Sequence, residues 1–146
     1  MTSDVVRDSG GLEVLGAQEC LRLLETVPVG RIVFTDRALP AVQPVNFAVS
    51  GGDIIIRTAP GSKLAAAARD AVVAFEADDL DPVSGSGWSV VVTGQARVVA
   101  EAGELARVRA LALRVWAPGA RDHFLAITPE LVSGRRISAS AGGSPA

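Results

Sequence analysis

Residues 54–64 read Ile54-Ile55-Ile56-Arg57-Thr58-Ala59-Pro60-Gly61-Ser62-Lys63-Leu64. The opening run is rich in β-branched side chains, which favour a strand. The proline and glycine that follow are typical of a turn and break the strand. Ser62 is a good helix N-cap, and the alanine-rich stretch up to Arg69 favours a helix. The segment therefore predicts a strand, a tight turn and a short helix.

The start of this helix is a candidate anion site. The first backbone N–H groups of a helix have no partners within it, and they carry the positive end of the helix dipole. Thr58 and Ser62 add hydroxyl groups, and Lys63 adds a full charge. Arg57 is close enough in sequence to add a second charge. An ordinary capped surface helix without a ligand would show the same residues, but Lys63 is the only lysine of the chain, which favours the anion site.

The rest of the chain predicts a mainly β domain with peripheral helices. Residues 50–53 join two apolar runs and are typical of a hairpin turn. Gly94 is expected at a bulge or where another backbone approaches closely. About six hairpin-linked strands favour an antiparallel barrel over a doubly wound sheet. The expected helices are Gln18–Val27, Lys63–Arg69 and Glu101–Trp116, the expected strands are Gly30–Thr35, Pro40–Val49, Ile54–Thr58, Ala71–Ala77, Trp88–Ala100, His123–Ile127 and Leu131–Ile137, and a loop is expected over Asp78–Gly87.

Length and composition indicate one domain with no nucleic-acid or membrane partner. The chain has 146 residues, a formal net charge of −2 and 49% apolar residues, so it can form one core and shows no dense basic surface. We expect a flexible lead over residues 1–14, the domain over 15–137 and a flexible tail over 138–146. No signal peptide is visible, and no apolar run approaches the roughly 20 residues of a membrane span. The single cysteine, Cys20, fits a reducing compartment, so a cytoplasmic protein is expected.

Few side chains of the chain are suited to acid–base or nucleophilic catalysis. There is no tyrosine, one histidine and one cysteine, and no set of residues has the spacing of metal ligands. Such a chain fits chemistry carried by a bound cofactor, so no catalytic residue and no metal is assigned. Trp88 fits either the core or an interface. Arg135 and Arg136 fit either an anion contact or a solvated strand end.

Five parts of the chain have a characteristic order and spacing. They are Val29–Phe34, Gln43–Phe47, Ile55–Leu64, Trp88–Gly94 and Ile127–Ile137. Together they resemble the FMN-binding split barrels of the pyridoxamine 5'-phosphate oxidase-like superfamily, in particular its small oxidase-like and nitroimidazole-resistance-like branch. The resemblance spans about Leu15 to Ile137, and it implies a six-stranded antiparallel split β-barrel.

The resemblance also implies a homodimer with the FMN site at its interface. One group of residues would run along the isoalloxazine ring and the ribityl chain, mostly through backbone groups: Gln43, Pro44, Val45, Asn46 and Phe47. Arg57 and Thr58 would lie beside the phosphate, which Ser62 and Lys63 would bind. Trp88 and Ser89 occupy the place where the long strand reaches the flavin.

The activity implied by the resemblance is that of an FMN-dependent oxidoreductase, which passes hydride or electrons between a reduced nicotinamide and a small acceptor. Full-length oxidases often carry two adjacent basic side chains where this chain has Lys63 alone, and their terminal substrate-binding basic residues have no clear counterpart here. Two alternatives stay open. One is a deazaflavin-dependent reductase of the same fold, and the other is a non-catalytic flavin- or haem-binding protein. His123 would be the haem ligand in the second case, and is otherwise an ordinary surface or turn histidine.

Overall fold

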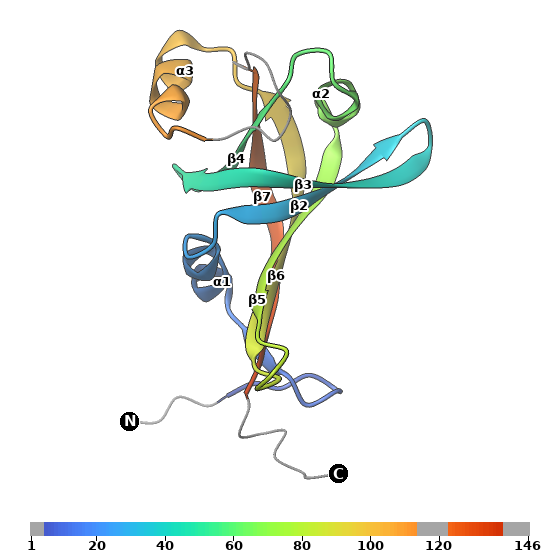
Figure 1. Cartoon of the computed structure of the whole chain (residues 1–146), viewed down its shortest axis with the longest axis vertical. Coiled ribbons are helices and arrows are strands. Elements are labelled where there is room, and N and C mark those ends of the chain that lie inside the picture. Colours follow the sequence, from blue (N-terminus) through green and yellow to red (C-terminus); the bar gives the residue numbers. More distant parts are fainter. Residues whose placement is uncertain (1–4, 114–122, 139–146) are drawn as a thin grey trace.

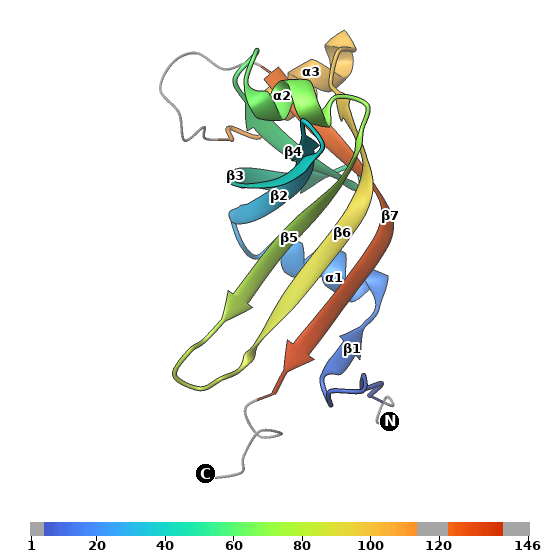
Figure 2. The same cartoon turned by 90° about the vertical axis from the view of Figure 1, so that its right-hand side faces the viewer.

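The computed structural model describes residues 5–113 and 123–138 of the chain. Strands dominate this part, and short helices lie around them (Figures 1 and 2). The strands are β1 (Glu13–Leu15), β2 (Val29–Asp36), β3 (Leu39–Ser50), β4 (Asp53–Thr58), β5 (Val72–Leu80), β6 (Gly87–Val98) and β7 (His123–Ile137), and the helices are α1 (Ala17–Leu24), α2 (Lys63–Ala68) and α3 (Ala102–Arg109).

The strands of the described residues form one antiparallel sheet that closes on itself. Its order is β1-β7-β4-β3-β2-β5-β6, and β6 pairs in addition with β7. Six strands therefore close a barrel, while β1 lies outside it on β7. Closure removes most of the free edges that an open sheet would expose. The six-stranded antiparallel barrel predicted from the sequence is confirmed.

The long pairing of β6 with β7 closes the barrel. β7 is one continuous strand, where the sequence predicted two shorter ones. The register shifts between Thr93 and Gly94, so that Gly94 lies opposite Pro129. A Cβ at Gly94 would lie 1.9 Å from the carbonyl oxygen of Thr128. The close approach predicted at Gly94 is confirmed, and a bulge at this point lets the long strands bend around the barrel.

Apolar side chains that alternate along the strands fill the barrel. Phe75 is fully buried, and its ring centre lies 4.7 Å from that of Phe47 in an edge-to-face arrangement, which stabilises the pair. Leu64 and Ala68 of α2 are buried in the same cluster, so α2 is anchored directly on the barrel. A second cluster lies under α3 and consists of Ile55, Val99, Val108, Phe124 and Ala126, with Leu105, Leu111 and Leu113 packed against it.

The hairpin of β5 and β6 is longer than predicted. The sequence placed Asp78 and Asp79 in a loop, whereas β5 runs to Leu80 and β6 begins at Gly87. The loop prediction was wrong for these residues because Asp78 pairs with Ser89 and Asp79 with Trp88, which extends the ladder despite the acidic composition.

Both longer helices are shorter than predicted. α1 ends at Leu24 rather than Val27, and α3 ends at Arg109, followed by Ala112 in a left-handed conformation with φ of 54°. Residues 114–116 of the predicted third helix lie outside the described residues. Glu13 and Val14, assigned to the lead from the sequence, pair with β7 as part of β1.

An ionic cluster lies on the outer face of β2 and β5. The Arg31 guanidinium is 3.1 Å from the Glu76 carboxylate and 3.4 Å from that of Asp78. Burial, together with the hydrogen bond and the negative charge of Asp78, raises the pKa of Glu76 to about 7, although Arg31 opposes the rise. Glu76 therefore holds a proton more readily in the folded protein than in the unfolded chain.

The stabilising contribution of Glu76 is expected to fall as the pH rises. A carboxyl group whose pKa is raised binds more protons when folded, so its contribution is full below the ordinary value of 4.5 and is lost as the pH passes about 7. Glu76→Gln should remove this change, which is on the order of 1 kcal/mol after solvent screening at a partly exposed site. Urea unfolding across this pH range measures it, with the exposed Glu130→Gln as the control. An unaltered pH profile in Glu76→Gln would contradict the assignment.

Candidate functional site

The turn between β4 and α2 has the geometry of a capped helix start. Thr58 ends β4, is 4% exposed, and has its hydroxyl 3.1 Å from that of Ser62. The Ser62 oxygen accepts a hydrogen bond from the Ala65 N–H at 3.0 Å, as an N-cap does. Gly61 adopts φ of 79°, a conformation that glycine reaches without strain. The strand, turn and N-cap predicted from the sequence are confirmed.

Several donors at this helix start are available to a ligand. Within residues 5–113 and 123–138, the backbone N–H groups of Lys63 and Leu64 and the Lys63 ammonium have no hydrogen-bond partner. One hydroxyl proton is also free, because only one of Thr58 and Ser62 can donate across the bond that they share. A negatively charged group at this position would therefore be stabilised by charge and by hydrogen bonds.

Arg57 does not join these donors. Neighbouring residues of a strand point to opposite faces, so the side chains of Arg57 and Thr58 diverge. Arg57 Nη1 donates to the carbonyl oxygen of Leu113 at 3.0 Å, and its guanidinium carbon lies 5.6 Å from the ring centre of Phe124. Arg57 is thus directed toward the cluster under α3. The second charge that the sequence placed beside Lys63 lies on the other side of the strand.

β3 separates from β4 next to this turn. The two strands pair only from Phe47 to Ser50, with Phe47 opposite Ile56. From Leu39 to Asn46, β3 pairs with β2, so the β2–β3 hairpin projects from the barrel beneath α2 (Figure 1). We call the side of β3 that faces away from β2 over residues 40–45 the open edge. The open edge and the start of α2 flank the point where the barrel splits.

The open edge presents few donors. The Phe47 N–H donates toward the β2 side, to Pro28, and backbone direction alternates along a strand. Pro40, Val42 and Pro44 therefore direct their backbone groups to the open edge. Because proline has no N–H, Val42 supplies the N–H donor over residues 40–45, beside several carbonyl acceptors. Such an edge is poorly suited to adding a strand and better suited to a ligand that also donates hydrogen bonds.

The side chains of the predicted β3 segment divide between core and solvent. Val45 and Phe47 are 3% and 4% exposed and belong to the barrel core, so they can offer a ligand little beyond their backbone. Gln43 and Pro44 are exposed, and Asn46 is half-buried. Contact through backbone groups, as the sequence analysis expected, agrees with this division.

Trp88 and Ser89 lie at the opposite end of the barrel from α2. The end of β6 near α2 is Val98, which pairs with Leu125, whereas Trp88 pairs with Arg136. Val98 lies ten residues after Trp88 along β6, a distance of roughly 30 Å. Trp88 is 8% exposed and packs in the core. The structure therefore does not bring Trp88 and Ser89 to the start of α2 within one chain.

A cavity of about 320 Å³ lies along one flank of α2. His123 is the first residue of β7 and pairs with Thr58, which places it under the helix. Its Nε2 is buried and has no hydrogen-bond partner. Arg69 is exposed, and it too has no partner among the described residues. The described lining consists of Gly61, Ala65, Ala66, Arg69, Val98 and His123.

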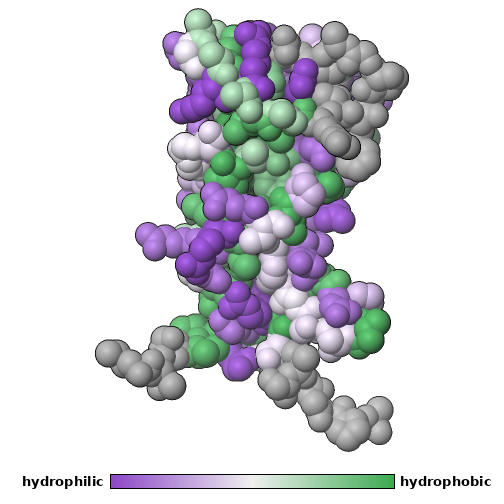
Figure 3. All heavy atoms as spheres, turned by 60° about the vertical axis from the view of Figure 1, so that its left-hand side comes forward, coloured by the Kyte–Doolittle hydropathy of each residue, from purple (hydrophilic) through white to green (hydrophobic). Residues whose placement is uncertain are grey.

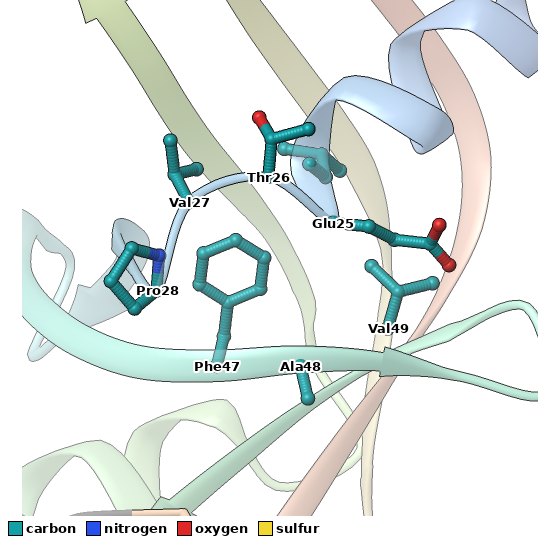
Figure 4. Close-up of a pocket in the computed structure, with 8 residues that line it drawn as sticks. Glu25, Thr26, Val27, Pro28, Phe47, Ala48 and Val49 are labelled. Carbon is teal, nitrogen blue, oxygen red and sulfur yellow. The ribbon is translucent and has the colours of Figure 1, made fainter.

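A second cavity, of about 370 Å³, lies between the end of α1 and β3 (Figure 4). The side of the molecule that carries α1 and α3 has mixed hydrophobic and hydrophilic surface (Figure 3). In the cavity, the Thr26 hydroxyl already donates to the Leu23 carbonyl, and Glu25 carries a negative charge. None of the described lining residues is basic, so this cavity is not suited to an anionic group. Its lining is Leu24, Glu25, Thr26, Val27, Pro28, Phe47, Ala48 and Val49.

The remaining candidates have structural partners. Arg135 donates to Asp8 at 2.9 Å, and Arg136 bonds to Glu13 and Glu19. These arginines tie the N-terminal segment and α1 to β7. Among the described residues, no helix is both long and apolar enough to cross a membrane.

A closed antiparallel barrel in which a hairpin separates from its neighbour beside a capped helix is a split barrel. The sequence profile of the family described as pyridoxamine 5'-phosphate oxidase matches residues 16–136. An uncharacterized protein of Mycobacterium tuberculosis, Rv0080, is 48% identical over 130 residues, which cover 86% of this chain and 85% of that protein. The chain belongs to the pyridoxamine 5'-phosphate oxidase family.

Solved structures of the same fold include two proteins described as FAD-binding. The one from Mycobacterium smegmatis is 39% identical with a TM-score of 0.73, and the match covers 84% of this chain and 95% of that one. The one from Mesorhizobium loti is 26% identical with a TM-score of 0.66, and the match covers 87% of this chain and 99% of that one.

Arg69 and the cavity beside it were missed by the sequence analysis. Three of its residues lie close together in sequence, because Gly61 precedes the Ser62 N-cap, Ala65 lies within α2 and Arg69 is the C-cap of that helix. The contribution of His123 and Val98 to the same cavity depends on pairing between distant strands, which no local pattern reveals.

Proposed function

We propose that this chain binds a flavin nucleotide with its phosphate at the start of α2, and that it acts as a flavin-dependent oxidoreductase. The observation that carries the proposal is the set of available donors at Lys63, Leu64 and the Thr58–Ser62 pair. Membership of this family supports a flavin phosphate as the anion. FMN is the part of FAD that holds the ring and the first phosphate, so one phosphate site serves both nucleotides.

The residues present fit such a group. A phosphate would accept hydrogen bonds from the Lys63 and Leu64 N–H groups, and the Lys63 ammonium would offset part of its charge. The polar edge of an isoalloxazine ring has one N–H between two carbonyls. The open edge, with the Val42 N–H among carbonyl acceptors, matches that mixture of donors and acceptors.

When bound, a flavin supplies the transfer of hydride or electrons, here between a reduced nicotinamide and a small acceptor. Lys63 and the backbone at the start of α2 would fix the phosphate. The open edge would orient the ring, and the buried side chains of Val45 and Phe47 would keep water from the strand beneath it.

A homodimer completes the proposed site. A row of outward side chains crosses the five strands β3, β2, β5, β6 and β7. Its members, each paired with the next across neighbouring strands, are Val42, Val33, Ala74, Thr93 and Leu131. Val42 is 64% and Leu131 is 70% exposed. In Figure 2, α1 lies behind β5, β6 and β7, so the outer face of these strands is uncovered by it. A second copy on this face would bury the row and could bring its Trp88 and Ser89 toward the flavin.

The apoprotein is expected to bind FMN, and to bind riboflavin at least tenfold more weakly. Riboflavin is the matched control, because it lacks the phosphate and so loses one charge-assisted contact of about 1.5–3 kcal/mol. Fluorescence titration measures both affinities, and bleaching of the bound flavin by reduced nicotinamide tests the oxidoreductase activity. A protein that binds neither compound refutes the proposal. If a deazaflavin displaces FMN when both are present at equal concentration, the cofactor is the deazaflavin and not FMN.

A further inference from the structure

We propose that the ionic cluster of Arg31, Glu76 and Asp78 makes the homodimer depend on pH, because a second copy docks on this face more tightly when Glu76 carries a proton. This inference rests on the homodimer of the proposed function and deepens it by naming the residue that controls its assembly. It predicts a dimer in mildly acidic solution that dissociates as the solution becomes basic.

The cluster lies on the same outer face as the row of outward side chains that the second copy would cover. Phe75 is buried, so its neighbours Ala74 and Glu76 both point outward from β5. Ala74 is a member of the row that ends at Val42 and Leu131. Glu76 follows Ala74 by two residues, a distance of about 7 Å along the strand. A copy that covers the row therefore covers Glu76 or lies against it.

Glu76 lies between a cation and an exposed apolar side chain. It pairs with Arg31 on β2 and with Val91 on β6. The Arg31 guanidinium is 3.1 Å from its carboxylate, and the Glu76 side chain is 27% exposed. Val91 is 38% exposed, so apolar surface continues beside the carboxylate. A second copy attracted by this apolar surface would remove water from Glu76 as well.

The charge of the cluster changes with one proton. With both carboxylates ionised, Arg31, Glu76 and Asp78 carry a net charge of −1, and with Glu76 protonated they carry none. The Arg31–Asp78 contact at 3.4 Å remains in the second state. Farther along the same face, Arg135 on β7 bonds to Asp8 at 2.9 Å, and that pair is neutral. The excess negative charge of these residues thus comes from the cluster alone.

Docking of two copies would bury this excess charge on both sides of the interface. Removal of an unbalanced carboxylate from water costs free energy, and it favours the protonated form. Two clusters of the same sign also repel each other across an interface. Protonation of Glu76 removes both penalties, so proton binding and dimer formation favour each other.

The pKa of Glu76 places this change near neutral pH. Burial raises that pKa to about 7, together with the hydrogen bond and the charge of Asp78, and Arg31 opposes the rise. Docking would raise the pKa further. Below the pKa each subunit already holds its proton, and above it each subunit must take one up before it associates. The association therefore weakens as the pH rises through 7.

Sedimentation velocity of the full chain at pH 6 and pH 8.5, at constant ionic strength, measures the dimer dissociation constant. The wild-type constant is expected to rise at least about tenfold between the two. Glu76→Gln is neutral at both pH values and should dimerise equally well at both. Asp78→Asn also removes one negative charge, so it should show a smaller rise, which keeps the test valid if Glu76→Gln folds poorly. Glu25→Gln is the control, because Glu25 is exposed at the end of α1, which lies behind these strands (Figure 2), and it should follow the wild type.

A wild-type dimer equally tight at both pH values would overturn the inference and leave the proposed homodimer intact. The full tenfold rise in both Glu76→Gln and Asp78→Asn would also overturn it, because another group would then control assembly. A protein that is monomeric at both pH values contradicts the proposed homodimer and this inference together, and the FMN titration then shows separately whether the flavin site holds.

Discussion

Replacement of Gly94 by alanine is expected to lower the free energy of unfolding by about 3 kcal/mol, at the upper end of what overpacking costs in a close-packed core. The added Cβ would lie 1.9 Å from the Thr128 carbonyl oxygen and 2.9 Å from its carbonyl carbon. These are backbone atoms of β7, so no side-chain rotation relieves the clash. The strands must move apart at the bulge through which β6 and β7 close the barrel.

Gly16→Ala is the matched control. Gly16 precedes α1 with φ of −73°, and a Cβ there would meet no atom within 4 Å. Its effect should be about 1 kcal/mol or less, since alanine is a poorer N-cap than glycine but adopts this extended conformation without strain or clash. Urea or thermal unfolding of both variants gives the comparison. Equal stability of Gly94→Ala and the wild type would show that the strands are not held as closely as in this structure.

The sequence predicts the fold well because the signals for hairpins and strands are local. The two glycines of the β3–β4 turn and the β-branched run of β4 set adjacent strands without reference to the rest of the chain. Gly94 is an interior glycine in a long strand, and such a residue has few explanations other than close approach. The predicted ends of strands are wrong where pairing with a neighbouring strand overrides the local amino-acid composition, as at Asp78 and Asp79.

The candidate site is predicted less completely, since it depends on which strand faces point together. Thr58, Ser62 and Lys63 are near one another in sequence, and their arrangement follows from a turn and a cap. Arg57 is just as near, yet strand alternation sends it to the opposite face, where it meets Leu113 and Phe124. The separation of Trp88 from α2 follows from the direction of β6 across the barrel, which is a property of topology.

These differences make Lys63 the critical residue of the proposed phosphate site. With Arg57 turned away, the phosphate is left with one ammonium group, a few N–H donors and one hydroxyl proton at the start of α2. Arg69 is the C-cap at the other end of the helix and does not belong to the donors at its start. A flavin phosphate bound here therefore depends on Lys63 more than it would in a site with two adjacent basic side chains.

Lys63→Ala is accordingly expected to weaken FMN binding by one to two orders of magnitude, because one charge-assisted contact contributes about 1.5–3 kcal/mol. The variant should fold normally, since the Lys63 side chain is exposed and the cap is formed by Ser62. Riboflavin affinity should stay unchanged in Lys63→Ala, because riboflavin has no phosphate for Lys63 to bind. Lys63→Arg should retain most of the FMN affinity, since the charge is kept. If Lys63→Ala binds FMN as the wild type does, the phosphate lies elsewhere, and a parallel fall in riboflavin affinity would mean that the substitution disturbs the ring site instead.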